Sequence, residues 1–175
     1  MFLTLRRFLF NRMGDLLPSS CFAWRRFVLR LMGVSVKKSA RVNAGFRVYG
    51  SGPLSLGDDV WIGRNCHFYT IGNAGVEIGV NAEIGPECVF NCQTHRIGEK
   101  EHRAGECVRH GISVGRGVWM GMRCTVLCEK IGDGAVIGAG AVVLDDVNEN
   151  VLAAGVPAVE KKSFMGTSKN FNFSR

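Results

Sequence analysis

The sequence predicts a mainly β protein: a prism of short parallel strands with a helical segment at its N-terminal end and one long loop that leaves the prism. From residue 54 onward, aliphatic residues recur with a period of six, whereas residues 1–41 carry apolar runs interrupted by arginine. The period of six stops for about 20 residues after Phe90. A chain of 175 residues suits one domain, and 46% hydrophobic content is enough for a packed core.

Residues 1–38 form a basic amphipathic segment that we expect to be a helical hairpin. Apolar residues recur at helical spacing on both sides of residues 14–20, where Pro18 breaks any helix. No apolar run reaches the roughly 18 residues that span a bilayer. Arg6, Arg7 and Arg12, with no small-residue cleavage site, argue against a secretory signal.

Two interpretations of this segment stay open. Its helices pack on the protein's own core or on a partner subunit, or residues 1–35 make a peripheral contact with an anionic membrane face. In either case we expect a cytoplasmic chain, free or peripheral on the inner face of the cell membrane.

The positive charge is confined to one end of the chain. Residues 1–41 contain nine Lys or Arg and one acid, Asp15, which is a net charge of +8. The whole chain carries +7, so residues 42–175 sum to −1. Basic residues of nucleic-acid-binding domains usually line the folded surface. We therefore expect a local electrostatic contact and no nucleic-acid partner.

The repeat has two restricted positions in each hexad. The first is filled by Leu56, Ile62, Phe68, Ile78, Ile84, Phe90, Val114, Met120, Val126, Ile131, Ile137 and Val143. Glycine follows eight of these twelve residues. The position two residues earlier is small or apolar in every hexad but one, where it is Glu129. Alternate residues of a strand share a face, so both positions point inward, as in a prism with three strands per coil.

The seven cysteines predict neither disulfides nor a zinc site. They form no CxxC pair, and an odd number suits no closed disulfide framework, so we expect a reducing compartment. Cys66, Cys88 and Cys124 occupy inward positions of the repeat and are interpreted as core filler.

Residues 118–159, "VWMGMRCTVLCEKIGDGAVIGAGAVVLDDVNENVLAAGVPAV", resemble the closing signature of the hexapeptide-repeat acyltransferases. The resemblance covers about residues 40–162. It is strongest to the maltose, galactoside and polysaccharide O-acetyltransferases, because "QTHRIG" and a long loop precede "VWMG". It implies a left-handed parallel β-helix over residues 39–160, a homotrimer with active sites between subunits, acetyl-CoA as co-substrate and no metal. Residues 161–175 are expected to form a basic polar tail.

The interruption of the repeat predicts a protruding loop over about residues 96–111. The next inward positions after Phe90 would be Arg96, His102 and Val108, and two of these cannot be buried cheaply. His95 stands where the loop begins, and by the resemblance it matches the general base of the family. A sugar hydroxyl is a weak nucleophile at neutral pH, and imidazole titrates near that pH. We therefore expect His95 to deprotonate the acceptor in direct transfer from acetyl-CoA.

Two rival chemistries are disfavoured. Cys92 and His95 are an odd number of residues apart, so in a strand they face opposite sides, which argues against an acetyl-cysteine route. A metal site of His95 with His67, His102 or His110, as in γ-class carbonic anhydrases, needs imidazoles on adjacent coils. The spacing along a charged loop does not provide that arrangement.

The resemblance also assigns the cofactor groove. It implies that Trp119 packs beside the pantetheine arm, that backbone groups of Met122 and Ala139 bind its amides, and that Lys162 lies near the adenine and its phosphates. Trp61 and Trp119 each precede an inward position, so we expect both to face outward.

Three departures from the regular pattern are expected to change the structure locally. The usual "TKD" of the family is Leu144-Asp145-Asp146 here, which removes a cation beside the nucleotide. One residue of the repeat is missing between Val126 and Ile131, so that corner should be irregular. A spacing of ten between Phe68 and Ile78 predicts a second, smaller bulge over residues 70–75.

The resemblance, with His95 at the start of the loop, thus implies an acetyl-CoA-dependent O-acetyltransferase. The expected acceptor is a sugar hydroxyl of a cell-surface polysaccharide, a glycolipid or a precursor. His67, Tyr69 and Asn91 are candidates to line its pocket, although each could equally be a corner residue. Two alternatives are N-acetylation of an amino-sugar nucleotide and a non-catalytic hexapeptide-repeat scaffold.

Overall fold

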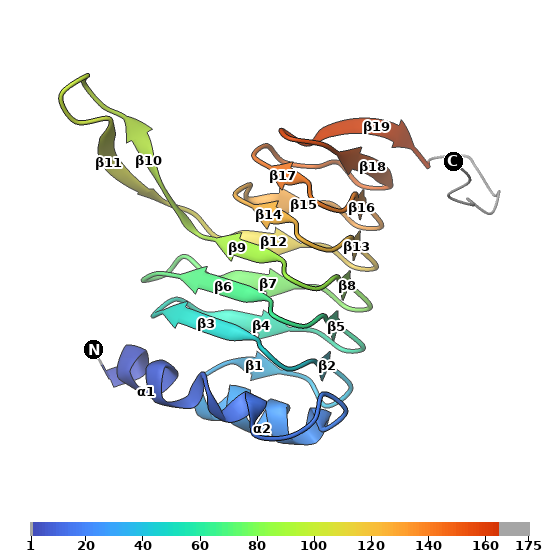
Figure 1. The fold of residues 1–175 in the computed structure, drawn as a ribbon. Coiled ribbons are helices and arrows are strands. Elements are labelled where there is room, and N and C mark those ends of the chain that lie inside the picture. Colours follow the sequence, from blue (N-terminus) through green and yellow to red (C-terminus); the bar gives the residue numbers. More distant parts are fainter. Residues whose placement is uncertain (1, 165–175) are drawn as a thin grey trace.

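The computed structural model describes residues 2–164 and shows a three-sided prism of stacked short strands (Figure 1). Face A contains β1 (Ser35–Val36), β4 (Leu54–Leu56), β7 (Val76–Ile78), β12 (Ile112–Val114) and β15 (Lys130–Ile131). Face B contains β2 (Arg41–Val42), β5 (Trp61–Ile62), β8 (Glu83–Ile84), β13 (Trp119–Met120), β16 (Val136–Ile137), β18 (Val151–Ala154) and β19 (Val159–Ser163). Face C contains β3 (Arg47–Gly50), β6 (His67–Thr70), β9 (Val89–Asn91), β14 (Thr125–Val126) and β17 (Val142–Val143). The predicted mainly β fold, a parallel β-helix of hexapeptide repeats, is confirmed.

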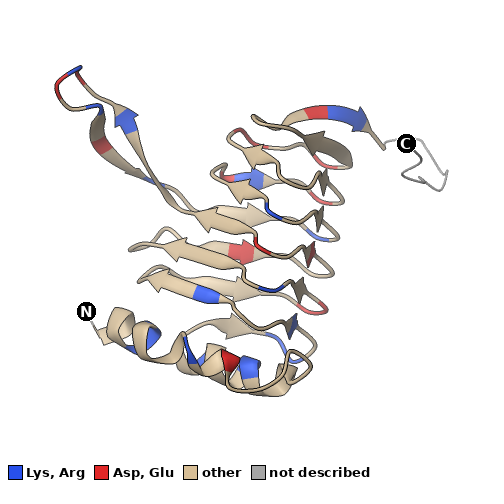
Figure 2. Cartoon of the chain, viewed as in Figure 1, with Lys and Arg blue, Asp and Glu red and all other residues tan. Residues whose placement is uncertain are grey.

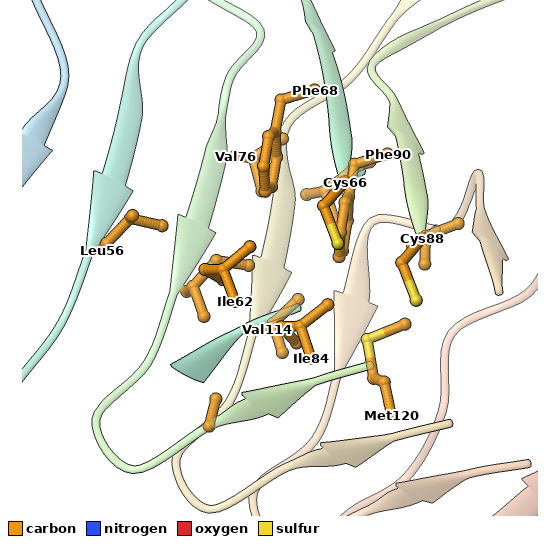
Figure 3. Close-up of a cluster of buried hydrophobic side chains, with 14 of the residues drawn as sticks. Leu56, Ile62, Cys66, Phe68, Val76, Ile84, Cys88, Phe90, Val114 and Met120 are labelled. Carbon is orange, nitrogen blue, oxygen red and sulfur yellow. The ribbon is translucent and has the colours of Figure 1, made fainter. Parts of the chain in front are cut away.

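Residues six apart in the sequence lie on successive faces, and equivalent residues of successive coils stack in register. On face B, Ile62 pairs with Ile84 and Ile84 pairs with Met120, all in parallel register. Figure 3 shows such side chains gathered inside the prism. Cys66, Cys88 and Cys124 are fully buried there, which places them in the core as predicted.

The glycine after an inward residue is required by the distance between coils. A Cβ atom on Gly63 would lie 2.5 Å from the backbone nitrogen of Pro86 in the next coil. One on Gly85 would lie 2.6 Å from the carbonyl carbon of Gly121. Real Cβ contacts are longer than this, so the corners can stack closely only because they carry no side chain there.

The irregular corner before β15 differs from the sequence interpretation. Glu129 is exposed and does not fill the inward position, which Cys128 takes instead. The backbone N–H groups of Glu129 and Lys130 both donate to Oδ1 of Asp146, at 3.0 and 2.8 Å. The hexad is one residue short here, and the Asp146 carboxylate accepts from the two backbone N–H groups that consequently lack a partner in the strand ladder. Asp146, which stands at the aspartate of the family's "TKD", therefore has a structural role at this corner.

The N-terminal segment forms α1 (Phe2–Phe10), the 3₁₀ turn η1 (Met13–Asp15) and α2 (Phe22–Leu31). Both helices lie across the N-terminal end of the prism, and Val28, Leu29 and Met32 are buried in the core (Figure 1). Over residues 2–164, no helix is both long enough and apolar enough to cross a membrane. Lys161 and Lys162 belong to β19, and residues 165–175 of the predicted tail lie outside the described residues.

The predicted protruding loop is an antiparallel hairpin of β10 (Gln93–Ile97) and β11 (Ala104–Arg109), which leaves the prism after β9 (Figure 1). The smaller bulge also forms, as a tight turn in which Ile71 and Ala74 exchange backbone hydrogen bonds at 2.9 and 2.8 Å. Both excursions begin at the C-terminal ends of strands on face C, and together they border the candidate site.

Candidate active site

His95 lies on β10 near the base of the hairpin, with its side chain exposed. Its Nδ1 atom is 2.9 Å from the backbone carbonyl oxygen of Gly105 on β11. A carbonyl oxygen can only accept a hydrogen bond, so Nδ1 carries the proton in this pair. In the neutral ring the lone pair is therefore on Nε2. The hairpin holds His95 in the tautomer that a general base needs.

A cavity of about 430 Å³ opens beside His95 on face C. It is lined by Tyr49, Gly50, Tyr69, Thr70, Ile71, Asn91, Gln93 and His95. Tyr49, Tyr69 and Asn91 are register partners on β3, β6 and β9, so they form one outward column across three coils. The rings of Tyr49 and Tyr69 stack with centroids 4.7 Å apart. Of the predicted acceptor residues, Tyr69 and Asn91 thus share this cavity with His95.

Tyr49 is a cavity residue that the sequence interpretation missed. It precedes Gly50 at the end of its strand and lies outside the quoted repeat, which began at residue 54. The spacing of the coils could have identified it, because Tyr49 lies twenty residues before Tyr69 and is its equivalent on the preceding coil.

His67 is close to this cavity but does not line it. Its ring meets those of Tyr49 and Tyr69 edge-on, with centroids 6.0 and 6.4 Å away. Burial, and then the nearby Arg47 cation, lowers the pKa of His67 below its usual value. The neutral ring therefore supports the tyrosine pair from the side.

The remaining histidines do not assemble a metal site with His95. His102 is exposed at the tip of the hairpin, and the backbone of His110 bonds to Cys92 where the chain rejoins the prism. Within residues 2–164, no three His, Cys, Asp or Glu side chains gather closely enough to hold a metal ion.

The predicted cofactor residues lie together on another side of the molecule. Trp119 is half-exposed on face B and pairs with Val136, which pairs with Leu152, which pairs with Lys162. The Met122 carbonyl accepts a hydrogen bond of 2.8 Å from Gly140, so the corners after β13 and β16 are joined. In Figure 1, β13 and β16 stand on the side of the prism opposite the hairpin. One chain therefore does not bring His95 and these residues together.

The chemistry of this surface fits a pantetheine arm. Ala139 is exposed, and no hydrogen bond among residues 2–164 engages its backbone N–H or carbonyl group. An amide of an extended ligand could use both groups. Trp119 offers an apolar surface beside them, and Lys161 and Lys162 are exposed cations farther along the same face.

Comparison with known proteins agrees with this geometry. The galactoside O-acetyltransferase of Escherichia coli (strain K12) is 32% identical over 127 residues, which is 69% of this chain and 62% of the relative. The putative colanic acid biosynthesis acetyltransferase WcaF of the same organism is 28% identical over 143 residues, covering 81% of this chain and 76% of WcaF. A galactoside acetyltransferase solved in complex with coenzyme A superposes with a TM-score of 0.66 and 26% identity, covering 98% of this chain and 86% of that one. The chain belongs to the hexapeptide-repeat acyltransferases.

The chain spans about 62% of the length of the galactoside O-acetyltransferase that it matches. No protein-family model matches the sequence.

The hairpin places an exposed thiol beside His95 to which the sequence interpretation gave no role. Cys107 is the register partner of His95 across the hairpin, so the two exposed side chains share one face. Cys92, the thiol weighed from the sequence, is fully buried, and burial raises its pKa to about 11. Cys92 therefore has neither the access nor the ionisation needed to carry an acetyl group.

Alkylation of Cys107 with N-ethylmaleimide is expected to lower acetyl transfer by at least about tenfold, because the added group crowds the imidazole. Cys107→Ser is expected to remain active and to resist the reagent. The rate of coenzyme A release before and after labelling, with the labelled residue located by mass spectrometry, checks this. Equal inactivation of wild type and Cys107→Ser would show that another thiol is responsible.

Proposed function

We propose that this protein is an acetyl-CoA-dependent O-acetyltransferase that acts on a sugar hydroxyl, with His95 as the general base. The observation that carries the proposal is the bond from His95 Nδ1–H to Gly105, which leaves Nε2 free to take a proton beside a cavity of about 430 Å³. The name of one relative, galactoside O-acetyltransferase, supports the same reaction class.

The chain's part in the reaction is proton transfer and positioning. Nε2 of His95 takes the proton of the acceptor hydroxyl as its oxygen forms a bond to the acetyl carbon. Acetyl-CoA supplies the thioester, whose carbon–sulfur bond breaks as the acetyl ester forms. The imidazolium then returns the proton to the departing sulfur, so His95 ends in its starting form. The Gly105 carbonyl stabilises the imidazolium through the proton on Nδ1.

The cavity has the composition of a carbohydrate site. The stacked rings of Tyr49 and Tyr69 offer an apolar wall for the faces of a sugar. The Asn91 amide nitrogen donates to the Gln93 carbonyl at 2.9 Å, so the amide oxygen is left to accept from a hydroxyl. We propose a cell-surface polysaccharide, a glycolipid or a precursor as acceptor, and the colanic acid name of one relative supports this class.

We also propose that the working enzyme is a cytoplasmic homotrimer. Its support is the separation of His95 from Trp119, Met122, Ala139 and Lys162 in a single chain. A second copy that brings its groove to the hairpin of the first would complete each site. In a cyclic trimer this contact repeats three times.

Release of coenzyme A from acetyl-CoA tests the proposed reaction. The full chain is assayed with a panel of simple sugars, nucleotide sugars, amino-sugar nucleotides and lipid-linked glycans. We expect coenzyme A release to depend on an acceptor with a free hydroxyl. We also expect the product to carry an acetyl ester that alkali hydrolyses. Release only with amino sugars, giving an alkali-stable amide, would favour N-acetylation. No release with any acceptor would favour a non-catalytic scaffold.

A further inference from the structure

The outward face of α1 is apolar. Phe2, Leu5, Phe8 and Leu9 are 83%, 56%, 74% and 59% exposed. Their spacing of three, four and seven residues places them on one side of the helix. Leu16 and Leu17, just after η1, and Phe27 on α2 are also exposed. We call Phe2, Leu5, Phe8 and Leu9 the N-terminal apolar surface.

The polar side of α1 points into the protein instead. Arg7 is fully buried, and its guanidinium donates to the carbonyl oxygens of Met32, Gly50 and Gly52 at 2.9 to 3.2 Å. Asn11 is buried and exchanges hydrogen bonds with the backbone of Val48. A helix that only capped the prism would bury its leucines and expose its arginine. The reversed orientation indicates that something apolar covers the outer side.

The surroundings of this surface are cationic. Residues 1–41 carry a net charge of +8, and Lys and Arg outnumber acidic residues across the helical layer (Figure 2). Arg12, Arg30, Lys37 and Lys38 are exposed. The one acid, Asp15, is already engaged by Arg47 at 2.7 Å and by the Gly45 N–H. The partner that covers this surface must therefore be both apolar and anionic.

From this combination we infer that the N-terminal apolar surface docks on an anionic phospholipid membrane. Leucine and phenylalanine side chains enter the acyl boundary while the arginines and lysines meet the lipid phosphates. A second copy of the chain fits less well, because residues 42–175 sum to only −1 and so offer little net negative charge to the basic end. In the proposed cyclic trimer the three basic ends are equivalent, so one membrane can neutralise all of them.

Vesicle flotation of the full chain tests the docking. We expect binding to phosphatidylcholine vesicles that contain phosphatidylglycerol, and at least about tenfold weaker binding to phosphatidylcholine alone or at high salt. The double variant Leu5→Gln/Leu9→Gln is expected to bind at least about tenfold more weakly, because it removes two inserted apolar side chains. Arg12→Gln should weaken binding only to the anionic vesicles.

A matched control separates docking from a general loss of apolar surface. Ile97 is 87% exposed on the hairpin, away from α1, and Ile97→Gln is expected to bind vesicles like the wild type. Three results would overturn the inference. The first is a wild type that does not float with anionic vesicles. The second is a double variant that binds these vesicles as tightly as the wild type does. The third is a double variant whose molar mass by light scattering is lower than that of the wild type. The last would mean that a second copy covers the surface.

The docking helix also borders the proposed acceptor cavity. The guanidinium of Arg7 bonds the Gly50 carbonyl and the Thr70 hydroxyl, and both residues line that cavity. A membrane at α1 therefore lies close to the place where the acceptor binds. This inference rests on the proposed function and extends it, because it names the natural acceptor as a membrane-attached glycan.

Acetyl transfer to isolated membranes tests this extension. Leu5→Gln/Leu9→Gln is expected to lose at least about tenfold of the radiolabel transferred from acetyl-CoA to membrane lipid. The same variant should keep wild-type coenzyme A release with the best soluble acceptor of the panel. Equal loss with both acceptors, or no loss with membranes, would overturn the membrane-attached acceptor. Failure of the wild type with every acceptor would instead overturn the proposed function and leave vesicle binding unaffected.

Discussion

His95→Ala is expected to lower kcat for acetyl transfer by about 10²- to 10⁴-fold, the usual contribution of a positioned general base. The variant removes the proton acceptor but leaves the scaffold intact, because the side chain is exposed and, within residues 2–164, hydrogen-bonds only to Gly105. His102→Ala is the matched control: it is an exposed histidine of the same hairpin, and its activity should stay within about twofold of wild type. Coenzyme A release at saturating acetyl-CoA measures both.

The same variant tests whether each site is shared between chains. Trp119→Ala removes the predicted groove residue on face B and is expected to raise the KM for acetyl-CoA. Chains of His95→Ala and Trp119→Ala, unfolded and refolded together, should have more activity at low acetyl-CoA than either variant alone, because some interfaces receive both intact residues. No such gain in a mixture shown to contain mixed trimers would mean that the groove and His95 serve the same chain. An unchanged kcat in His95→Ala would remove His95 as the base.

The prism could be predicted because its period is written directly in the sequence. Each coil repeats the same inward positions, so residues such as Ile62, Ile84 and Met120 identify themselves by spacing and stack in the register that the period requires. His95 could be singled out for the opposite reason, because the period fails immediately after it. Its role as the base, like the roles of Trp119, Met122, Ala139 and Lys162, stays a prediction.

The features that the sequence did not reveal depend on contacts without a periodic signal. The pairing of β10 with β11 is made by backbone groups, so the charged residues 96–106 gave no strand pattern. That pairing alone brings Cys107 and Gly105 to His95. The period of six assigned Glu129 to an inward position, but the repeat is one residue short between Val126 and Ile131. Cys128 moves inward, and Asp146 binds the freed N–H groups.

Arg7→Ala is expected to have the largest effect on stability, lowering the free energy of unfolding by about 2–4 kcal/mol. Its guanidinium donates to three carbonyl groups, two of them buried, and to the buried Thr70 hydroxyl, and alanine leaves all four acceptors without this donor. None of these acceptors is a carboxylate, and burial lowers the pKa of Arg7 below its usual range, so part of the loss is offset by removing a buried charge.

Thermal unfolding followed by circular dichroism measures this loss. In a chain of this size, about 1 kcal/mol corresponds to roughly 2–4 °C in Tm, so a fall of about 5–15 °C is expected. Arg12→Ala, an exposed arginine of the same segment, should leave Tm almost unchanged. Arg7→Lys keeps the charge but cannot reach several acceptors with one ammonium, so it should lie between the two. A Tm of Arg7→Ala equal to that of Arg12→Ala would mean that α1 is not held to the prism through this guanidinium.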